Sequence, residues 1–465
     1  MQSKLPVMPC KFTDRENELS ALDNAYKDRP GLLVVYGRRR IGKTRLLVEW
    51  LKRNQRGVVY YVSHLSSHME NLRGLADRAS RQLGDPLLSS VTFENLGSLL
   101  SVIHRSGGEV VVLDEFTYWV RGSPRVLSEL QEYVDNVLPG TNMLLVLTGS
   151  LLGVMERDVL GGGSPLYARA SHVLRLRELS FECLRELVQS LTPVDRVRVY
   201  ALVGGIPFYL CQLAGVRSFR EAVEKLIVSP ASILAEEKDL ILREELRDPH
   251  AYNAILSALA RGYTRPSSIA VVTGLDQSHV RKYLHTLEYL RIVERVVPLF
   301  MKKGWYRISD PVIRTWFTLV KPVLELLELE KREEALNEIL RRIDTYTSSV
   351  WEQVLMKHLL KKHAAEGYTK SGPLVHKGEE IDIALVNPEE KKVIVGEAKW
   401  SRLTLREAEK IRRATEAKAA RLVPEGYMVE NVYVGAREVS DTARTPQWIL
   451  TPRTIESDST CSSRG

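Results

Sequence analysis

A glycine- and arginine-rich segment near the N-terminus separates an apolar run from an amphipathic stretch. It matches the spacing Gly-x-x-x-x-Gly-Lys-Ser/Thr, which is typical of a phosphate-binding loop between a strand and a helix. Glycines let successive backbone N–H groups curl around phosphates, and the dipole of the following helix favours negative charge. A surface turn is the alternative, but both flanks favour a nucleotide site. The expected nucleotide contacts are Gly37, Arg38, Arg39, Arg40, Ile41, Gly42, Lys43, Thr44 and Arg45.

Two carboxylates about 70 residues downstream end the apolar run VVVLDEF. We expect Lys43 to reach the β- and γ-phosphates of ATP, and Thr44 and Asp114 to hold Mg²⁺. Glu115 would then polarise the attacking water. Such a pair alone is often a solvated loop, but the upstream loop favours the catalytic interpretation. Ser150 and Thr148 end the next apolar run, where they either orient water or the γ-phosphate, or are ordinary strand-end residues.

A second set of residues that could bind a metal ion or position water lies near the C-terminus. Glu352 falls in a helical pattern, Asp382 in the strand-like run EIDIALV, and Glu397 and Lys399 in the run KVIVGEAKW. Alternate residues of a strand share a face, so Glu397 and Lys399 are expected to point together. Asp382 and Glu397 could hold Mg²⁺, Lys399 could position water, and Glu352 would complete the acidic group.

The runs that carry the first site are short, continuous and rich in β-branched residues. LLVVYG (32–37), GVVYYVS (57–63), EVVVLDEF (109–116) and NMLLVLTGS (142–150) suit strands buried on both faces of a parallel sheet. The intervening segments are long enough for crossover helices. The predicted fold class is therefore α/β, with helices on both faces of the sheet.

The middle of the chain predicts helices and then a hairpin. Residues 176–248 are helical, with Asp195 and Ser218 as expected N-caps. Three helices follow in 250–290, the second ending at Gly274 and the third capped by Asp276. The runs IVERVVPLF and WYRISD then predict two strands. The expected exposed polar residues are Ser278, His279, Arg281, Lys282 and His285 of the third helix, and Lys302 and Lys303 of the turn.

Composition narrows the class of protein. The 465 residues suggest about three domains, and 44% hydrophobic with 27% charged residues is ordinary for a soluble globular protein. A formal net charge of +8 permits a polyanionic partner without requiring one. The four cysteines are far apart, which predicts neither a disulfide framework nor a zinc site and fits a reducing cytoplasm. Neither a signal peptide nor a membrane span is expected.

The ordered motifs resemble those of the archaeal ATPases of the AAA+/STAND superfamily of P-loop proteins. The resemblance covers about residues 10–320 and rests on FTDRENEL (12–19), GRRRIGKT, LDEF, LTGS, SPLYARA (164–170) and GGIP (204–207). It implies that Arg15 and Pro207 contact the nucleotide. It also implies that Arg169 contacts the γ-phosphate, either in its own subunit or in a neighbouring one. A surface ion pair is the alternative for Arg169.

Two further resemblances concern the rest of the chain. Three helices and a hairpin resemble a winged helix, which implies contact with double-stranded DNA or, alternatively, a role in interdomain packing or protein binding. The order of Glu352, Asp382, Glu397 and Lys399 resembles the PD-(D/E)xK nuclease fold and the C-terminal domain often joined to these ATPases. Ile381 stands where the Pro of the Pro-Asp dipeptide is expected. This departure is tolerated in the fold, and an inactive domain stays an alternative.

Together these expectations describe an ATP- and Mg²⁺-dependent ATPase that controls DNA binding or processing. The alternative is a STAND-type nucleotide switch that acts through protein contacts, and either a homo-oligomer or a partner protein is compatible with the sequence. The expected divisions are a P-loop domain (1–175), a helical lid (176–248), a winged helix (249–320), a connector helix (321–347), a nuclease-like domain (348–450) and a disordered tail (451–465).

Overall fold

The computed structural model describes residues 10–53, 56–246, 249–440 and 445–458. These form two compact units. The N-terminal unit is Asp14–Glu178, and the C-terminal unit runs from Leu179 onward and includes the segment that ends at Thr13. Among the described residues, no helix is long and apolar enough to cross a membrane.

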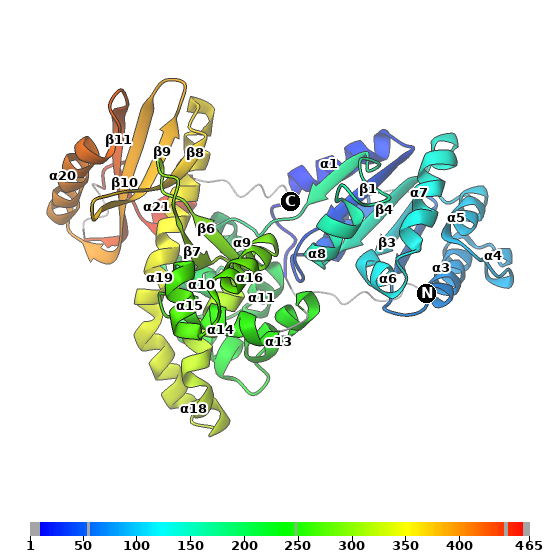
Figure 1. The fold of residues 1–465 in the computed structure, drawn as a ribbon, viewed down its shortest axis with the longest axis horizontal. Helices are drawn as coiled ribbons and strands as arrows, with labels where there is room; N and C mark the ends of the chain where they lie inside the picture. The colour runs from blue at the N-terminus through cyan, green and yellow to red at the C-terminus, as the bar shows by residue number, and fades with distance from the viewer. Residues whose placement is uncertain (1–9, 54–55, 247–248, 441–444, 459–465) are drawn as a thin grey trace. The chain divides into compact units, whose positions relative to one another are not determined.

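The N-terminal unit is a parallel sheet in the order β2-β3-β4-β1-β5 with helices around it (Figure 1). The four predicted strands are confirmed, because their continuous apolar runs are buried on both faces. Strand β5 was not predicted, because it is only partly buried and has no apolar run. The elements are α1 Glu16–Lys27, β1 Gly31–Tyr36, α2 Lys43–Leu51, β2 Val58–Val62, α3 His68–Leu83, α4 Leu87–Ser90, α5 Leu96–Arg105, β3 Val110–Asp114, α6 Phe116–Gly122, α7 Val126–Asn136, η1 Leu138–Gly140, β4 Leu144–Gly149, α8 Leu152–Val154, η2 Met155–Val159 and β5 His172–Arg175.

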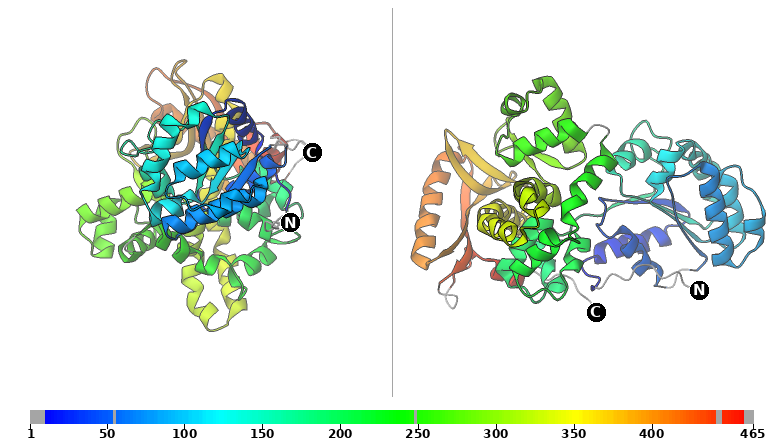
Figure 2. Two further views of the ribbon diagram at one scale, coloured as in Figure 1. Left: turned by 90° about the vertical axis from the view of Figure 1, so that its right-hand side faces the viewer. Right: turned by 90° about the horizontal axis from the view of Figure 1, so that it is seen from below.

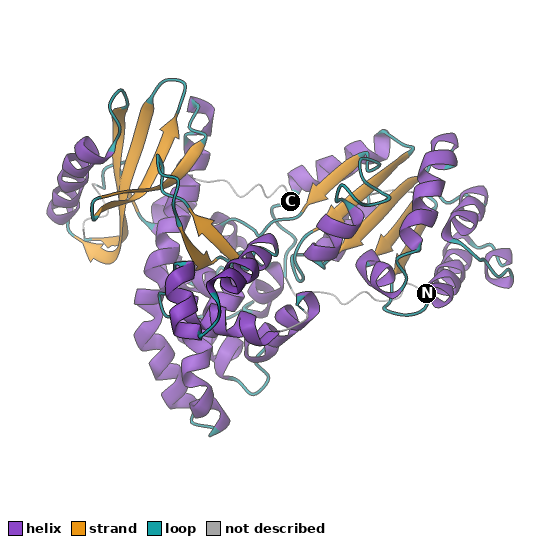
Figure 3. Cartoon of the chain, viewed as in Figure 1, coloured by secondary structure: helices purple, strands orange, loops and turns teal. Residues whose placement is uncertain are grey.

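The C-terminal unit begins with helices that Figure 3 shows in purple. Ser218 and Asp276 are N-caps as predicted, and Gly274 ends α15 in the left-handed region. Asp195 is not a cap; the Thr192 hydroxyl accepts from its backbone N–H instead. The elements up to residue 328 are η3 Phe181–Cys183, α9 Leu184–Leu187, α10 Pro193–Val203, α11 Pro207–Gln212, α12 Phe219–Val223, η4 Glu224–Val228, α13 Leu234–Glu245, α14 Pro249–Ala260, α15 Pro266–Thr273, α16 Gln277–Tyr289, β6 Val293–Val296, β7 Trp305–Ile308, α17 Pro311–Thr315, η5 Trp316–Val320, η6 Lys321–Val323 and α18 Leu324–Glu328.

A mixed sheet in the order β12-β11-β10-β9-β8 completes the unit. Strands β8, β9 and β10 pair antiparallel, whereas β10, β11 and β12 pair parallel. The remaining elements are α19 Arg332–Lys362, η7 Ala364–Glu366, β8 Lys370–His376, β9 Glu379–Asn387, β10 Lys392–Leu403, α20 Leu405–Leu422, β11 Met428–Val439, β12 Ile449–Leu450 and α21 Pro452–Asp458.

The helix α19 is continuous, so the expected boundary between a connector and a C-terminal domain at 347–348 lies inside a helix. Its buried residues recur along the whole length, from Ala335 and Ile339 to Val354 and Leu359. In the right-hand view of Figure 2 it is seen nearly end-on, between the C-terminal sheet and the green helices. The charge-laced sequence is its solvated face, and the opposite face joins one core.

Two cysteines contradict the expectation of no disulfide. Cys10 and Cys211 are bonded, with their Cα atoms 5.4 Å apart. They are 201 residues apart in sequence, so no local spacing of cysteines predicts the bond. Cys183 is free and buried, and Cys461 lies outside the described residues.

The expectation of a disordered tail from residue 451 is wrong for its first half. Helix α21 packs on α10, with Ile455 and Glu456 buried. Glu456 accepts from Arg196 Nε at 2.6 Å and from Nη2 at 2.7 Å, and its carbonyl accepts from Arg185. This two-point ion pair holds α21 against α10, although the Ser/Thr-rich composition of the segment predicts disorder. Residues 459–465 lie outside the described part.

Glu456→Ala should destabilise the C-terminal unit by about 3 kcal/mol, because it leaves the Arg196 guanidinium buried without its carboxylate. The measurement is the thermal unfolding midpoint of that unit. Arg453→Ala, on the exposed face of the same helix, is the matched control and should change little. Equal midpoints for the two variants would contradict the proposed anchoring.

Candidate nucleotide site and acidic site

The phosphate-binding segment joins the end of β1 to the start of α2. Gly42 adopts φ 96° directly before α2, a conformation that a side chain disfavours. A Cβ on Gly37 would lie 2.7 Å from the carbonyl oxygen of Leu176. The Lys43 amine donates to the carbonyls of Gly37 at 3.0 Å and Arg38 at 3.3 Å. The segment therefore curls around a lysine amine at a helix N-terminus, which suits a phosphate.

Lys43 is buried, and burial lowers the pKa of its amine, while the charges of Glu115 and Asp114 oppose that change. An ammonium in this position is stabilised by the two carboxylates and would be stabilised further by an anion. The position therefore favours binding of a negatively charged ligand.

Asp114 ends β3 in a network that holds both its oxygens. Thr44 Oγ1 donates to Oδ2 at 2.9 Å, and the Tyr60 hydroxyl donates to the same oxygen. Thr148 Oγ1 and the backbone N–H of Glu115 donate to Oδ1. The predicted magnesium ligands Thr44 and Asp114, 70 residues apart, therefore lie together.

Glu115 follows with φ 50° and ψ 39°, a left-handed conformation that few residues other than glycine adopt. Its Oε2 accepts from the Ser150 hydroxyl at 2.6 Å and from the Ser150 N–H at 3.2 Å. Its own N–H donates to Thr148 Oγ1 at 3.0 Å. Such a conformation persists where neighbours fix it, and it is typical of functional residues. Thr148 and Ser150 thus position the two carboxylates.

Tyr60 of β2 was missed by sequence reasoning. Burial and the Asp114 charge raise the pKa of its hydroxyl well above the ordinary 10.0, so it stays a donor. The available signal was a tyrosine inside an apolar strand that pairs with β3, in the register Tyr60↔Val112.

The remaining predicted nucleotide contacts are placed as follows. Arg15 is buried, and its guanidinium donates to Glu18 and to the carbonyls of Ile41 and Arg177. It therefore braces the phosphate-binding loop. Pro207 begins α11 in the C-terminal unit. Its contact with a nucleotide, like that of Arg15, stays a prediction.

Three arginines of the glycine-rich segment and its helix have charged neighbours. Arg38 pairs with Glu178 at 3.6 Å and Arg45 with Glu49 at 2.9 Å, while the charge of Arg39 lowers the pKa of Lys43. Arg40 has φ 67° within the loop.

Arg169 makes the ion pair that was the alternative to a γ-phosphate contact. Its Nε and Nη2 donate to the two oxygens of Asp135 at 2.7 and 2.9 Å. The Asp135 hydrogen bond raises the pKa of the guanidinium. An exposed pair of this kind contributes little to stability, so it does not prevent another role.

Three residues of the C-terminal set, Asp382, Glu397 and Lys399, also lie together. Asp382 on β9 and Glu397 on β10 flank the Ile383↔Gly396 register pair, and Lys399 Nζ lies 3.0 Å from Glu397 Oε1 and 4.0 Å from Asp382 Oδ2. The Ala398 N–H donates to Asp382 Oδ2 at 2.8 Å. Glu397 Oε2 is buried and has no hydrogen-bond partner.

Lys418 of α20 is a member of this group that the sequence did not reveal. Its amine lies 3.3 Å from Glu397 Oε1 and donates to the Glu380 carbonyl at 3.1 Å. It is 21 residues from Glu397, on a helix with many charged residues, so spacing alone could not select it.

Burial and the neighbouring acids perturb the carboxyl groups of this site. Burial, followed by the Asp382 charge, raises the pKa of Glu352 to about 7. Burial also raises the pKa of Asp382, against the Ala398 hydrogen bond. Within the described ranges, no group of three or more His, Cys, Asp or Glu residues is placed to hold a metal ion. The expected Mg²⁺ ligands Asp382 and Glu397 are thus only a pair.

The predicted exposed residues of the three-helix group are exposed. Ser278, His279, Arg281, Lys282 and His285 lie on the solvent side of α16, and Lys302 and Lys303 lie in the turn after β6. The antiparallel pair β6–β7 follows the three helices, as predicted.

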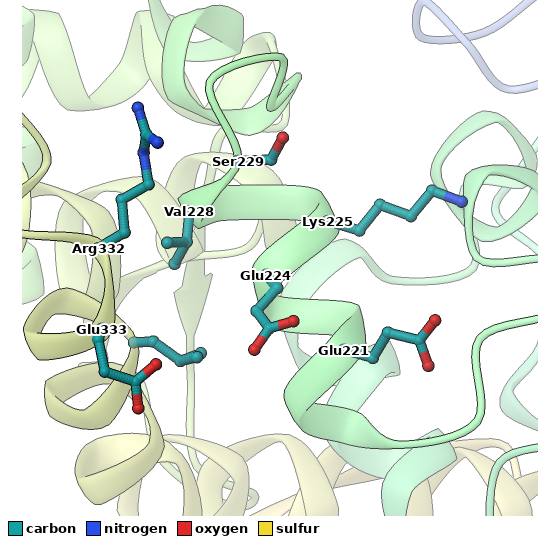
Figure 4. Close-up of a pocket in the computed structure, with 8 residues that line it drawn as sticks. Glu221, Glu224, Lys225, Val228, Ser229, Arg332 and Glu333 are labelled. Carbon is teal, nitrogen blue, oxygen red and sulfur yellow. The ribbon is translucent and has the colours of Figure 1, made fainter. Parts of the chain in front are cut away.

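A separate groove of about 410 Å³ lies between η4 and the start of α19 (Figure 4). Glu221, Glu224 and Glu333 line it, and Arg220 pairs with the last two at 3.4 and 2.5 Å. These are solvated ion pairs between helices, and they carry no chemistry of their own.

The parallel sheet, the glycine-rich loop and the joined Thr44 and Asp114 define a P-loop ATPase-type core. Residues 12–213 match a family described as an ATPase domain predominantly from Archaea, and residues 316–411 match a family of archaeal and bacterial proteins of unknown function. The N-terminal part of the chain is therefore similar to the ATPase domains of that first family.

Individual proteins are similar to the chain in sequence or in fold. The chain is 29% identical over 411 residues to an uncharacterized protein of Methanocaldococcus jannaschii, covering 86% of this chain and 90% of that one. A Walker-type ATPase of Pyrococcus abyssi has a similar fold, with a TM-score of 0.50 and 22% identity over 66% of this chain and 96% of that one.

Glu352→Gln should stabilise the C-terminal unit progressively as pH rises. The Glu352 carboxyl titrates near 4.5 when unfolded and near 7 when folded. Folding therefore retains a proton between these values, and the stability that this proton contributes is lost as pH rises through 7. The gain of the variant over the unchanged chain should grow by about 3 kcal/mol between pH 4 and pH 8.

Thermal unfolding in EDTA across that pH range measures this gain. Glu425→Gln, an exposed carboxyl in the same unit, should show no such trend. A gain for Glu352→Gln that is constant with pH would contradict the raised pKa.

Proposed function

We propose that the chain binds ATP with Mg²⁺ at residues 37–45 and hydrolyses its γ-phosphate. The observation that carries this proposal is the direct hydrogen bond between Thr44 and Asp114, which brings the loop and the acidic strand end together. In the proposal, backbone N–H groups of the loop and the Lys43 amine hold the phosphates. Thr44 and Asp114 hold Mg²⁺, which when bound would neutralise charge on the phosphate oxygens.

Glu115 is the proposed base. Ser150 and the left-handed backbone fix its carboxylate, so its position need not be organised when substrate binds. It would accept the proton of a water molecule that attacks the γ-phosphorus as the bond to the β-phosphate oxygen breaks. Arg15 and Pro207 are proposed nucleotide contacts. Arg169 would leave Asp135 to stabilise the γ-phosphate, in cis or in a homo-oligomer.

Glu115→Gln should keep ATP binding and lower the hydrolysis rate by a factor of about 10² to 10⁴, because only the base is lost. Phosphate release measures the rate, and the shift of the thermal midpoint with ATP and Mg²⁺ measures binding. Lys43→Ala should lose the shift as well. Glu132→Gln, an exposed carboxyl of α7, is the control. Normal hydrolysis by Glu115→Gln would exclude Glu115 as the base.

We further propose that the C-terminal unit contacts double-stranded DNA and acts on it at the acidic site. The specific observation is the buried Glu397 Oε2 without a partner, close to Asp382 and two lysines, because a cation or a substrate-bound water would satisfy such an atom. Mg²⁺ would be held by Asp382 and Glu397 and would polarise a phosphate oxygen. The three helices and hairpin would serve as a winged helix, with α16 toward the DNA.

Asp382→Asn should abolish magnesium-dependent nicking of plasmid or branched DNA, because it removes one charge of the carboxylate pair. Lys282→Ala should weaken duplex binding and its salt dependence, whereas the exposed Lys225→Ala on η4 should not. Absence of both nicking and salt-sensitive binding would refute this second proposal. A nucleotide switch that acts through protein contacts would then be favoured.

A further inference from the structure

The loop between β6 and β7 packs on the C-terminal sheet. The Leu299 N–H donates to the Pro373 carbonyl of β8 at 2.9 Å. The Leu299 side chain packs against the apolar cluster formed by β8, β9, β10, β11 and α20. The rings of Phe300 and Tyr427 meet edge to face, with centroids 5.2 Å apart. The hairpin is thus attached to the sheet that carries the acidic site.

The strand register gives this hairpin two distinct faces. Val293 and Ile308 are buried opposite each other in one cluster with residues of α14, α15 and α16, so this face is turned to the three helices. Alternate residues take the opposite face. That second face carries the register pairs Glu294↔Arg307 and Val296↔Trp305.

The second face lies close enough to the acidic site for the charge of Arg307 to act on a carboxyl group of that site. Burial and the Asp382 charge raise the pKa of Glu352, and the nearby Arg307 guanidinium opposes that rise. Arg307 also donates to Glu294 Oε1 at 2.6 Å, with 35% of the Arg307 side chain and 43% of the Glu294 side chain exposed. Such a half-exposed pair contributes little to stability, so the guanidinium can exchange it for another anion.

We propose that the β6–β7 hairpin is part of the substrate site of the C-terminal sheet, and that Arg307 binds a backbone phosphate of the nucleic acid held at Asp382, Glu397 and Lys399. This inference rests on the proposed action on DNA. It adds that the three-helix group and the sheet bind nucleic acid as one surface. A guanidinium suits this role because its planar donors match two phosphate oxygens at once.

Trp305 completes the proposed contact. It is partly exposed on the same strand face as Arg307, two residues away. An aromatic side chain beside a phosphate-binding arginine can pack against a sugar of the nucleic-acid backbone. The proposed ligand is therefore a polynucleotide, with one phosphate at Arg307 and a neighbouring one at the acidic site.

The test is the salt-dependent binding of a fluorescent duplex by the full chain, with Ca²⁺ in place of Mg²⁺ to suppress cleavage. Arg307→Ala should weaken binding about tenfold and reduce the slope of log affinity against log salt by about 1, because one phosphate contact is lost. Arg307→Lys should recover the slope but only part of the affinity. The thermal unfolding midpoint of the C-terminal unit should be unchanged, which verifies folding.

Arg295→Ala is the matched control, since Arg295 is an exposed arginine on the other face of the same hairpin. It should change affinity less than twofold. If Arg307→Ala and Arg295→Ala behave alike while Lys282→Ala still weakens binding, this inference fails and the proposed DNA function stands. If the unchanged chain shows no salt-sensitive binding, both fail.

Discussion

The Asp114 carboxylate is the point at which the phosphate-binding loop meets three neighbouring strands. It accepts from Thr44 at the start of α2, from Tyr60 on β2 and from Thr148 on β4, while its own residue ends β3. Removing a carboxylate from water costs several kcal/mol, and the cost is repaid only where hydrogen bonds satisfy its oxygens. Strand order places Tyr60 and Thr148 on either side of it. The strand order of the sheet therefore determines which side chains surround the Asp114 carboxylate.

The same constraint accounts for the unusual conformations beside Asp114. Glu115 must turn its carboxylate toward Ser150 while α6 begins at the next residue, and the left-handed backbone achieves both. Lys43 is buried with carbonyls as its hydrogen-bond acceptors, and burial lowers its pKa. The left-handed backbone of Glu115 and the buried amine of Lys43 both cost stability. Such departures from the preferred backbone conformation and from solvent exposure of charges are common at functional sites. Arg15 supports the loop from outside through the carbonyls of Ile41 and Arg177.

Sequence reasoning succeeded where the signal is local. The strands β1 to β4, the loop 37–44 and the pair Asp114–Glu115 each lie within a few residues of their own signals, and the structure brings them together. Sequence reasoning failed where a residue's bonding partner is distant in the sequence or belongs to another element. The Cys10–Cys211 bond, the Arg196–Glu456 pair and the Lys418–Glu397 contact each join residues that no spacing connects. The roles of Arg169, Arg15 and Pro207 came from resemblance and stay predictions.

Continuity of α19 limits how a nucleotide could influence the acidic site. Asp344, near the middle of this helix, accepts from Arg198 of α10, Trp400 of β10 and Arg437 of β11. The Tyr346 hydroxyl donates to the Ala201 carbonyl of α10. These contacts join the helices that follow the ATPase sheet to the C-terminal sheet, and the loop at Leu299 joins the hairpin to the same sheet. A hinge at residue 347 would break this core. We therefore expect the three-helix group, α19 and the acidic site to move as one body, because the Tyr346 hydrogen bond and the apolar side chains of α19 that separate movement would disrupt are buried.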